Sequence, residues 1–314
     1  MYALRLPLPL PLVRSLTSVL LLLTFDVSSR EVATLTLAEG RSTIVSGARG
    51  YLPAVGMQLE QCNIVHTSAN GLLQFEIANH GMIQVGPETR FVADLPSPSA
   101  GTIGPHFLLS GWAKVTVPKR DQGAPHRINT PLFDVAIDSG VVVLHVAADG
   151  AQAFVESGEI TVLEAGGRSA AKLAVRAGST YSRKSVGEKG EVASRADPKL
   201  VSSMPGAFRD TLPPRLAQIK VANIVLKPAT DYDYKDVESW LQSDPDVRQC
   251  LVAVMVRGVQ EELERRGIEV GPIDGILGPR TQAALRIFQQ KQGLAQSGHL
   301  DQDTLKALNV AEGR

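Results

Sequence analysis

Apolar and polar side chains alternate with a period of two from Arg30 to about Tyr181, and this pattern constrains the fold more than any other feature. Turn residues interrupt the alternation every 8–12 residues or so, which is typical of the short strands of an all-β domain. The run Leu73–Ala78 alternates, Asn79-His80-Gly81 follows as a turn, and Met82–Gly86 alternates again. Two runs joined this closely predict a β-hairpin.

Further runs with the same alternation predict strands in the second half of this region. They are Ala113–Val117, Leu132–Ile137, Val141–Ala147, Ala151–Val155, Glu159–Glu164 and Lys172–Gly178. The groups Asp138–Gly140, Asp149–Gly150 and Glu156–Gly158 separate several of them and are interpreted as turns. The Pro/Ser/Gly-rich stretch Pro96–Pro105 predicts an exposed loop within the same domain.

Composition excludes several classes of function. The chain has 314 residues, and its 32 basic and 32 acidic side chains give a net charge of zero. A neutral chain is not expected to bind nucleic acid or an anionic membrane surface through a basic patch. The length corresponds to about two domains. Two cysteines are too few for a disulfide scaffold or for a four-cysteine zinc site.

The first 29 residues have the pattern of an export signal. Arg5 and Arg14 precede an apolar run from Leu16 to Phe25. This run has the length of a signal-peptide core and is shorter than the roughly 20 apolar residues that a membrane-spanning helix needs. Val27 and Ser29 would occupy the −3 and −1 positions of a cleavage site. We therefore expect a periplasmic protein exported through this segment, with an uncleaved anchor as the alternative.

Residues 182–246 differ in composition from the regions on either side. The stretch Ser182–Lys199 is polar and aperiodic, which indicates a linker or a mobile loop. Further on, Val237, Trp240 and Leu241 lie at helical spacing within Asp233–Asp244. We expect a short amphipathic helix there that packs against the β domain.

The β region, residues 30–181, resembles a FecR-like domain, a periplasmic β module named after a regulator of iron uptake. The resemblance rests on the order of the phrases Ile44–Tyr51, Leu59–Phe91, Leu108–Val115, His126–Gly140 and Phe154–Gly167. The sigma-regulator members of that family carry a cytoplasmic segment and a transmembrane helix before this domain, whereas this chain has a signal-like start. The resemblance therefore implies a periplasmic β scaffold and does not carry over the iron-signalling role.

Residues 247–311 change to the period of a helix. Val252, Val256, Val259 and Leu263 fall at i, i+4, i+7 and i+11, and Gly267 suits the end of that helix. These positions predict a first helix with one buried stripe.

Two more helices are predicted in the same segment. Pro279 suits the first position of the second helix, and Ala284, Ile287 and Phe288 form its predicted buried face. Asp301 is a good N-cap for the third helix. The segment is expected to fold as a compact all-α unit of three helices.

This C-terminal segment resembles the type 1 peptidoglycan-binding domain. That family combines a glutamine in the first helix with an Asp-Gly-x-x-Gly-x-x-Thr loop, an Ala-rich helix that ends in Phe-Gln, and a Gly-x-Leu-Asp-x-x-Thr-Leu close. The chain carries these elements as Gln260, Asp274-Gly275, Gly278, Thr281, Ala283-Ala284, Phe288-Gln289, Gly293-Leu294, Gly298–Asp301 and Thr304-Leu305. The resemblance implies a domain that binds the glycan or the stem peptide of peptidoglycan.

The candidate binding residues come from this motif and from the chemistry of its side chains. Glutamine amides can donate to and accept from peptide and sugar groups. The competing interpretation is structural, because Asp and Thr cap turns, glycines supply positive φ, and Gln260 and Gln289 can brace the loop. The candidates are Gln260, Asp274, Gly275, Gly278, Thr281, Gln289 and Gln290.

Cys62 and Cys250 lie far apart in the chain, in segments that we expect to belong to different domains. Export would permit a disulfide between them. Two separately buried thiols are the favoured prediction.

The motifs of wall enzymes are missing from the sequence. Neither cysteine lies in the Ser-His-Gly-Cys context of an L,D-transpeptidase, and the six histidines show no His-Glu-x-x-His spacing. We therefore predict a protein without catalytic activity, cofactor or metal. It would bind peptidoglycan and present its β domain to an envelope protein or sense the state of the envelope. The alternatives are a FecR-type signalling regulator and an accessory cell-wall hydrolase.

Overall fold

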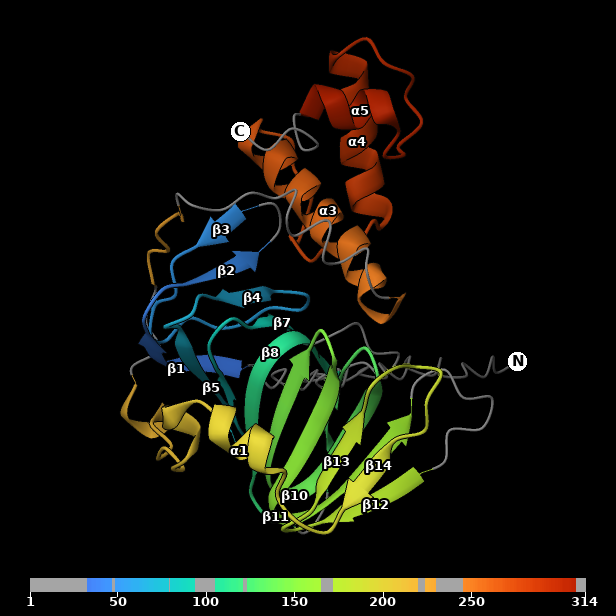
Figure 1. Cartoon of the computed structure of the whole chain (residues 1–314). Coiled ribbons are helices and arrows are strands. Elements are labelled where there is room, and N and C mark those ends of the chain that lie inside the picture. The colour runs from blue at the N-terminus through green and yellow to red at the C-terminus, as the bar shows by residue number, and fades with distance from the viewer. Residues whose placement is uncertain are drawn as a thin grey trace, which may run out of the picture.

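The computed structural model describes residues 33–46, 49–78, 80–93, 105–120, 123–164, 172–219, 224–229 and 245–308. Within these ranges a β region comes first and three helices come last (Figure 1). The predicted fold class, an all-β module followed by a small all-α module, is confirmed. The expected signal segment at 1–29, the expected helix at 233–244 and nearly all of the loop at 96–105 lie outside the described residues.

The described strands form one continuous hydrogen-bonded sheet. Its main path runs β14-β13-β11-β10-β9-β8-β7-β4-β2-β3, with β6 attached to β8, β5 to β6, β1 to β5 and β12 to β11. The strands are β1 (Ala33–Glu39), β2 (Ser42–Ser46), β3 (Arg49–Tyr51), β4 (Ile64–Thr67), β5 (Leu72–Ile77), β6 (Gly81–Val85), β7 (Arg90–Val92), β8 (His106–Val117), β9 (His126–Asn129), β10 (Phe133–Ala147), β11 (Gly150–Glu164), β12 (Lys172–Arg176), β13 (Thr180–Arg183) and β14 (Glu191–Ala193).

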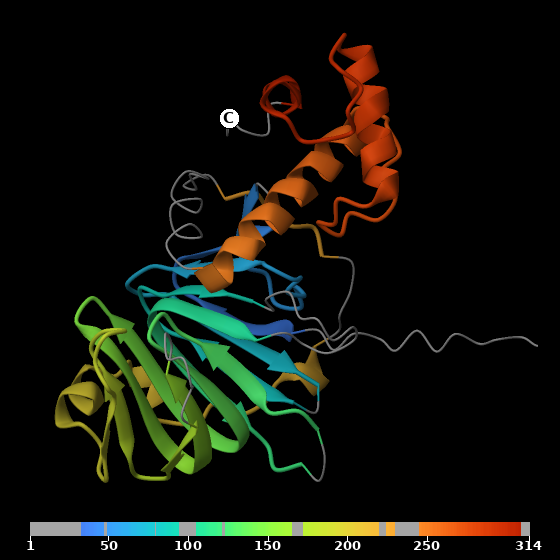
Figure 2. The ribbon, with the colours of Figure 1, turned by 90° about the vertical axis from the view of Figure 1, so that its right-hand side faces the viewer.

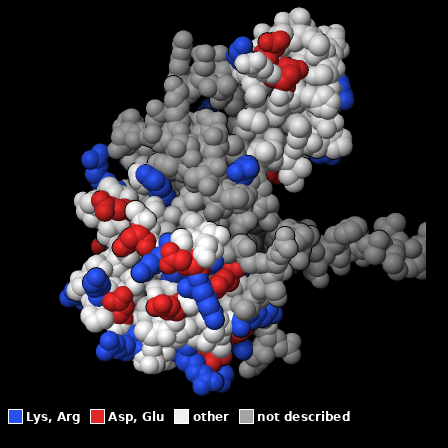
Figure 3. Space-filling view, turned by 45° about the vertical axis from the view of Figure 1, so that its right-hand side comes forward, with Lys and Arg blue, Asp and Glu red and all other residues white. Residues whose placement is uncertain are grey.

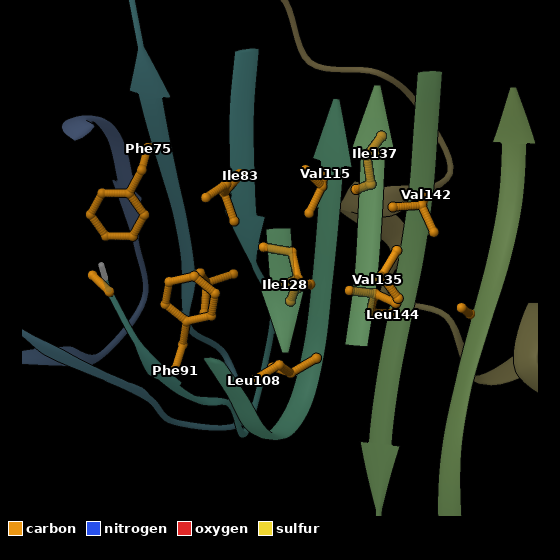
Figure 4. Close-up of a cluster of buried hydrophobic side chains, with 14 of the residues drawn as sticks. Phe75, Ile83, Phe91, Leu108, Val115, Ile128, Val135, Ile137, Val142 and Leu144 are labelled. Atoms are coloured by element: carbon orange, nitrogen blue, oxygen red, sulfur yellow. The ribbon is translucent and has the colours of Figure 1, made fainter. Parts of the chain in front are cut away.

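The inner face of the folded sheet encloses the main apolar core. Phe75 and Phe91 lie at one side of it, and Ile128, Val135 and Leu144 lie further across the sheet, on β9 and β10 (Figure 4). All five side chains are buried. Alternation along each strand delivers these residues to one side, as the period-two pattern predicts.

The hairpin predicted at residues 73–86 is confirmed as the antiparallel pair of β5 and β6, with Leu73 opposite Val85. The tight turn predicted at Asp149-Gly150 is also present, because Ala147 pairs with Gly150 across it.

Two other predicted turns are wrong. Residues 138–140 lie inside β10 and residues 156–158 inside β11, so each pair of predicted strands is a single strand of 15 residues. Gly140 and Gly158 face each other with φ of 129° and 79°, and the register shifts near them. The glycines bend the ribbon as bulges instead of reversing the chain. A Cβ on Gly140 would lie 2.2 Å from the Ser157 carbonyl oxygen.

The segment predicted as a linker is instead partly built into the β region. Strand β13 pairs with β11, and β14 pairs with β13. After them come α1 (Pro198–Ser203) and the short 3₁₀ turns η1 (Gly206–Phe208) and η2 (Leu216–Gln218). Leu200, Met204 and Phe208 pack on Trp112 and Val143 at the outer face of the sheet. These contacts with distant parts of the chain hold the segment on the sheet, and the local composition does not reveal them.

Two buried charged side chains fix this segment to the sheet. The Lys114 ammonium pairs with Glu156 at 2.9 Å and donates to the Phe208 carbonyl at 2.7 Å. The Glu76 carboxylate accepts the backbone N–H groups of Arg215 at 2.7 Å and Leu216 at 2.9 Å. Buried charges need such partners.

The C-terminal helices are α3 (Pro245–Arg265), α4 (Pro279–Lys291) and α5 (Gln302–Leu308). Val259, Leu263, Leu285, Phe288 and Leu308 form a core of their own. Pro279 lies in the first turn of α4, as predicted. The Asp301 carboxylate caps α5 by accepting the Thr304 N–H at 2.8 Å, which is also as predicted.

Two of the predicted buried positions in these helices are wrong. Val252 is 57% exposed and Ile287 is 46% exposed. Leu285 takes the place expected for Ile287 in the helical core. Val252 is exposed because the first part of α3 packs on the β region through a different set of residues.

The first part of α3 shares a small core with the β region, and a disulfide joins the two. Val247, Cys250 and Val254 pack with Ile64 and Phe107 and their neighbours. Figure 2 shows α3 running from the sheet into the helical domain. Cys62 and Cys250 form a disulfide with a Cα–Cα distance of 5.4 Å. The prediction of two separate thiols is therefore wrong, because α3 extends beyond its domain and brings Cys250 onto the sheet.

Among the described residues, no helix has both the length and the apolar character that crossing a membrane requires.

Candidate functional site

The first group of candidate residues surrounds the amide of Gln260 on α3. Its Nε2 donates to Asp274 Oδ1 and Thr281 Oγ1, each at 3.0 Å, and to the Ile276 carbonyl at 3.2 Å. Its Oε1 accepts the Gly275 N–H at 2.8 Å. Gly275 has a φ of 76°, which a residue with a side chain rarely adopts. The amide thus closes the loop between α3 and α4.

The second group surrounds the amide of Gln289 on α4. Its Nε2 donates to Thr304 Oγ1 at 3.0 Å, and to Ser297 Oγ and the His299 carbonyl at 3.1 Å each. Its Oε1 accepts the Gly298 N–H at 2.8 Å. This amide closes the loop between α4 and α5 in the same manner.

These two groups are one structural unit used twice. In each, a buried helical glutamine accepts from a glycine N–H and donates to a threonine hydroxyl at the start of the next helix. Gln260 is 1% exposed and Gln289 is fully buried. Their amides are therefore committed to holding the loops, which is the structural interpretation that the sequence had left open.

The structure separates the predicted candidates into three places. Gly278 is the N-cap of α4 and has a φ of −84°, so the expected positive φ is found at Gly275 and not at Gly278. The Asp274 side chain is exposed, but its Oδ1 also accepts the Ile276 N–H at 2.8 Å. Gln260, Asp274, Gly275, Gly278 and Thr281 lie around the first loop, Gln289 lies in the second group, and Gln290 is exposed on α4.

Gln290 belongs to an exposed stripe on α4. Ala283, Ile287 and Gln290 fall at i, i+4 and i+7 and are all exposed, so they share one side of the helix. In Figure 3 the visible face of the helical domain carries few charged side chains apart from a small group near its top. The stripe offers apolar contact and an amide, and the exposed cations Arg280, Arg286 and Lys291 of the same helix lie next to it.

Sequence reasoning missed the second network. Ser297, Gly298 and Thr304 were not among the candidates, although the order glutamine, glycine, threonine occurs first at 260–281 and again at 289–304. That repetition was a signal for a structural role of both glutamines.

The described residues contain no group of three or more His, Cys, Asp or Glu side chains placed to hold a metal ion. The amides of Gln260 and Gln289 are occupied in loop closure, whereas the Gln290 amide is exposed. The chemistry that this arrangement supports is hydrogen bonding and apolar contact with a ligand.

Residues 254–308 match the family described as "Putative peptidoglycan binding domain". The match covers α4, α5 and most of α3, and it includes both glutamine networks. The chain therefore carries a domain of this family at its C-terminal end, and the sequence resemblance to it is confirmed.

Part of the chain is also similar in structure to two crystal structures from Parabacteroides distasonis ATCC 8503, each titled "putative anti-sigma factor". The one at 1.65 Å resolution is 12% identical with a TM-score of 0.37, and the match covers 44% of this chain and 62% of that one. The one at 2.50 Å is 10% identical with a TM-score of 0.38, and the match covers 57% of this chain and 90% of that one. The curated proteins include no match to this chain.

Proposed function

We propose that this protein is a non-catalytic component of the cell envelope that binds peptidoglycan through its helical domain and holds its β region at the wall. The family match over residues 254–308 is the observation that carries the proposal. Export to the periplasm through residues 1–29 is part of it and rests on the sequence pattern.

The exposed stripe on α4 is the proposed contact surface of the helical domain. Gln290 supplies an amide that can both donate and accept, and Ile287 supplies an apolar side chain 46% exposed to solvent. The buried glutamines act behind this surface by fixing the two loops between the helices.

The β region is proposed to present an interaction surface for an envelope protein or to sense the state of the envelope. The shared core and the Cys62–Cys250 disulfide tie the sheet to α3. A ligand or force that acts on the helical domain would therefore reach the sheet through a covalent connection and not through a loose tether.

Retention on purified sacculi tests the proposal. Full-length protein should sediment with sacculi, and Ile287→Asp should reduce the bound fraction about tenfold, because a carboxylate would replace an apolar contact. Val192→Asp on β14 is the matched control, since Val192 is 45% exposed and lies on the β region. No sedimentation of the unchanged protein would contradict wall binding, and clearing of sacculi in a zymogram would contradict the non-catalytic assignment.

A further inference from the structure

A cleft of about 940 Å³ lies between the β region and the helical domain. This volume is within the range of sites that bind small ligands. The β region contributes Met57, Glu60 and Asn63 to its lining, and the helical domain contributes Arg257, Glu261 and Ile273. The site exists only because α3 is fixed to the sheet.

The cleft contains an ion pair whose two side chains differ in their exposure to solvent. The Arg257 Nη1 contacts Glu60 Oε2 at 2.9 Å and donates to the Gln61 carbonyl at 3.3 Å. The Arg257 side chain is only 8% exposed, whereas that of Glu60 is 57% exposed. The guanidinium is therefore held in place by packing, while its carboxylate partner can turn into solvent at small cost. Another carboxylate could take the place of Glu60.

Two buried N–H donors in the lining have no acceptor among the described residues. They are Asn63 Nδ2 and Arg257 Nε. The other end of the Asn63 amide is used, because its Oδ1 accepts the Glu60 N–H at 2.9 Å. A buried donor without a partner costs about 1–3 kcal/mol, so such donors in a cleft wall indicate that a bound group supplies the acceptor.

We propose that this cleft binds the carboxylate-bearing stem peptide of peptidoglycan, with Arg257 pairing with the ligand carboxylate and Asn63 donating to it. The inference rests on the proposed function for the identity of the polymer. Ligand alkyl groups would lie against Ile273 and Met57.

The charges around the cleft determine how the variants should behave. Glu60 and Glu261 are acidic and Arg257 is basic within the lining. Burial raises the pKa of Glu261, Arg49 and Arg257 oppose that shift, and Glu60 adds to it. Removing an acidic charge should favour an incoming carboxylate, and removing Arg257 should disfavour it.

Calorimetric titration of the full-length oxidised protein tests the proposal. The probes are the disaccharide tetrapeptide released from sacculi by a muramidase, and N,N′-diacetylchitobiose, a disaccharide that has neither the peptide nor a carboxylate. We expect binding of the first probe only. Arg257→Gln should weaken that binding at least about tenfold, and Glu60→Gln should tighten it about three- to tenfold. Glu264→Gln is the matched control, because Glu264 is exposed on the same helix outside the cleft and should leave affinity unchanged.

The affinity changes expected for Arg257→Gln and Glu60→Gln have opposite signs, which distinguishes ligand binding from a structural role of the ion pair. If Arg257→Gln does not fold, tightening by Glu60→Gln decides the matter. Equal weakening by both variants, or equal binding of both probes, would overturn the proposal. Retention on sacculi without binding of the tetrapeptide probe would overturn the cleft and leave wall binding intact. If the protein neither sediments with sacculi nor binds the tetrapeptide probe, both the wall-binding proposal and the cleft proposal are overturned.

Discussion

At the residue scale, the two buried glutamines determine whether the helical domain holds its shape. Each amide satisfies a glycine N–H and a threonine hydroxyl that would otherwise be buried without a partner. Their place in the family motif therefore reflects folding. In the proposed function, contact with the ligand falls to exposed neighbours such as Gln290.

Replacing Gln260 should destabilise the helical domain. Gln260→Ala removes the amide and leaves the Gly275 N–H unsatisfied, so we expect a loss of about 2–4 kcal/mol in the free energy of unfolding. Gln290→Ala is the control and should change it by less than about 0.5 kcal/mol, because Gln290 is exposed. Urea unfolding followed by helical circular dichroism measures both. Equal stability of the two variants would contradict the bracing role.

His126 should make the protein sensitive to acid. Burial lowers the pKa of His126 to about 4, with the charges of His80 and Arg120 acting in the same direction. The neighbouring His106 ring lies 5.2 Å away, and burial also lowers its pKa. The unfolded chain takes up a proton below about pH 6.5, whereas folded His126 resists until about pH 4. Stability should therefore fall as the pH drops between these values.

The effect of His126 can be measured from urea unfolding at several pH values. Its contribution to the loss is up to about 3 kcal/mol. His126→Phe should flatten the pH dependence, and His299→Phe, at an exposed position, should not. An unchanged slope in His126→Phe would show that other groups cause the acid sensitivity.

At the scale of elements, polar composition did not predict the segment that covers the outer face of the sheet. Residues 198–219 belong to the region 182–246, whose composition differs from that of its neighbours, yet Leu200 and Phe208 are buried on the sheet. Lys114 and Glu76 hydrogen-bond to this segment from strands that precede their partners by 94 and 139 residues.

Removing the charge of Glu76 should release the segment around η2. Burial raises the pKa of Glu76, but hydrogen bonds from Thr36, the Arg215 and Leu216 N–H groups, and Gln74 outweigh it and hold the pKa below its usual value. The anchor is therefore present above about pH 4.5 and is lost as the pH falls through the lowered pKa.

Hydrogen exchange tests this anchor. In Glu76→Gln the Arg215 and Leu216 amides should exchange about tenfold or more faster at neutral pH, because a neutral amide is a weaker acceptor than a carboxylate. Glu39→Gln, at an exposed position on β1, should leave those two amides protected as before. Unchanged exchange in Glu76→Gln would show that packing alone holds the segment.

The long β10–β11 ribbon shows where local patterns mislead. Gly-containing triplets at 138–140 and 156–158 have the composition of turns, and the alternation breaks at both. Because the two breaks fall opposite each other, the strands accommodate them together as a bulged bend. Only the pairing partner distinguishes a bulge from a turn.

At the scale of the whole molecule, the disulfide joins two regions that the sequence assigns to separate domains. Cys62 and Cys250 are 188 positions apart, and both are buried. The cross-link restricts the unfolded chain and fixes α3 on the sheet, where the interdomain cleft forms.

Replacing both cysteines tests this connection. The Cys62→Ser/Cys250→Ser variant should lose about 2–5 kcal/mol in the free energy of unfolding. Thiol titration of the denatured protein without reductant should detect no free thiol in the unchanged chain. Two free thiols per chain, or an unchanged free energy of unfolding in the double variant, would contradict a stabilising disulfide. The exposed control Ser202→Ala should behave as the unchanged protein.

The two fold classes, the hairpin at 73–86, the start of α4 at Pro279, the Asp301 cap of α5 and the family of the C-terminal domain follow from the sequence. Each of these features depends on a sequence pattern between a few and about fifty residues long. Within such a pattern the interacting residues are near one another in the chain. The tertiary structure alone decided the Cys62–Cys250 pairing, the burial of Gln260 and Gln289, and the cleft at Arg257. These features depend on which distant segments of the chain pack together. A local pattern of side chains does not indicate which distant segment will pack against it.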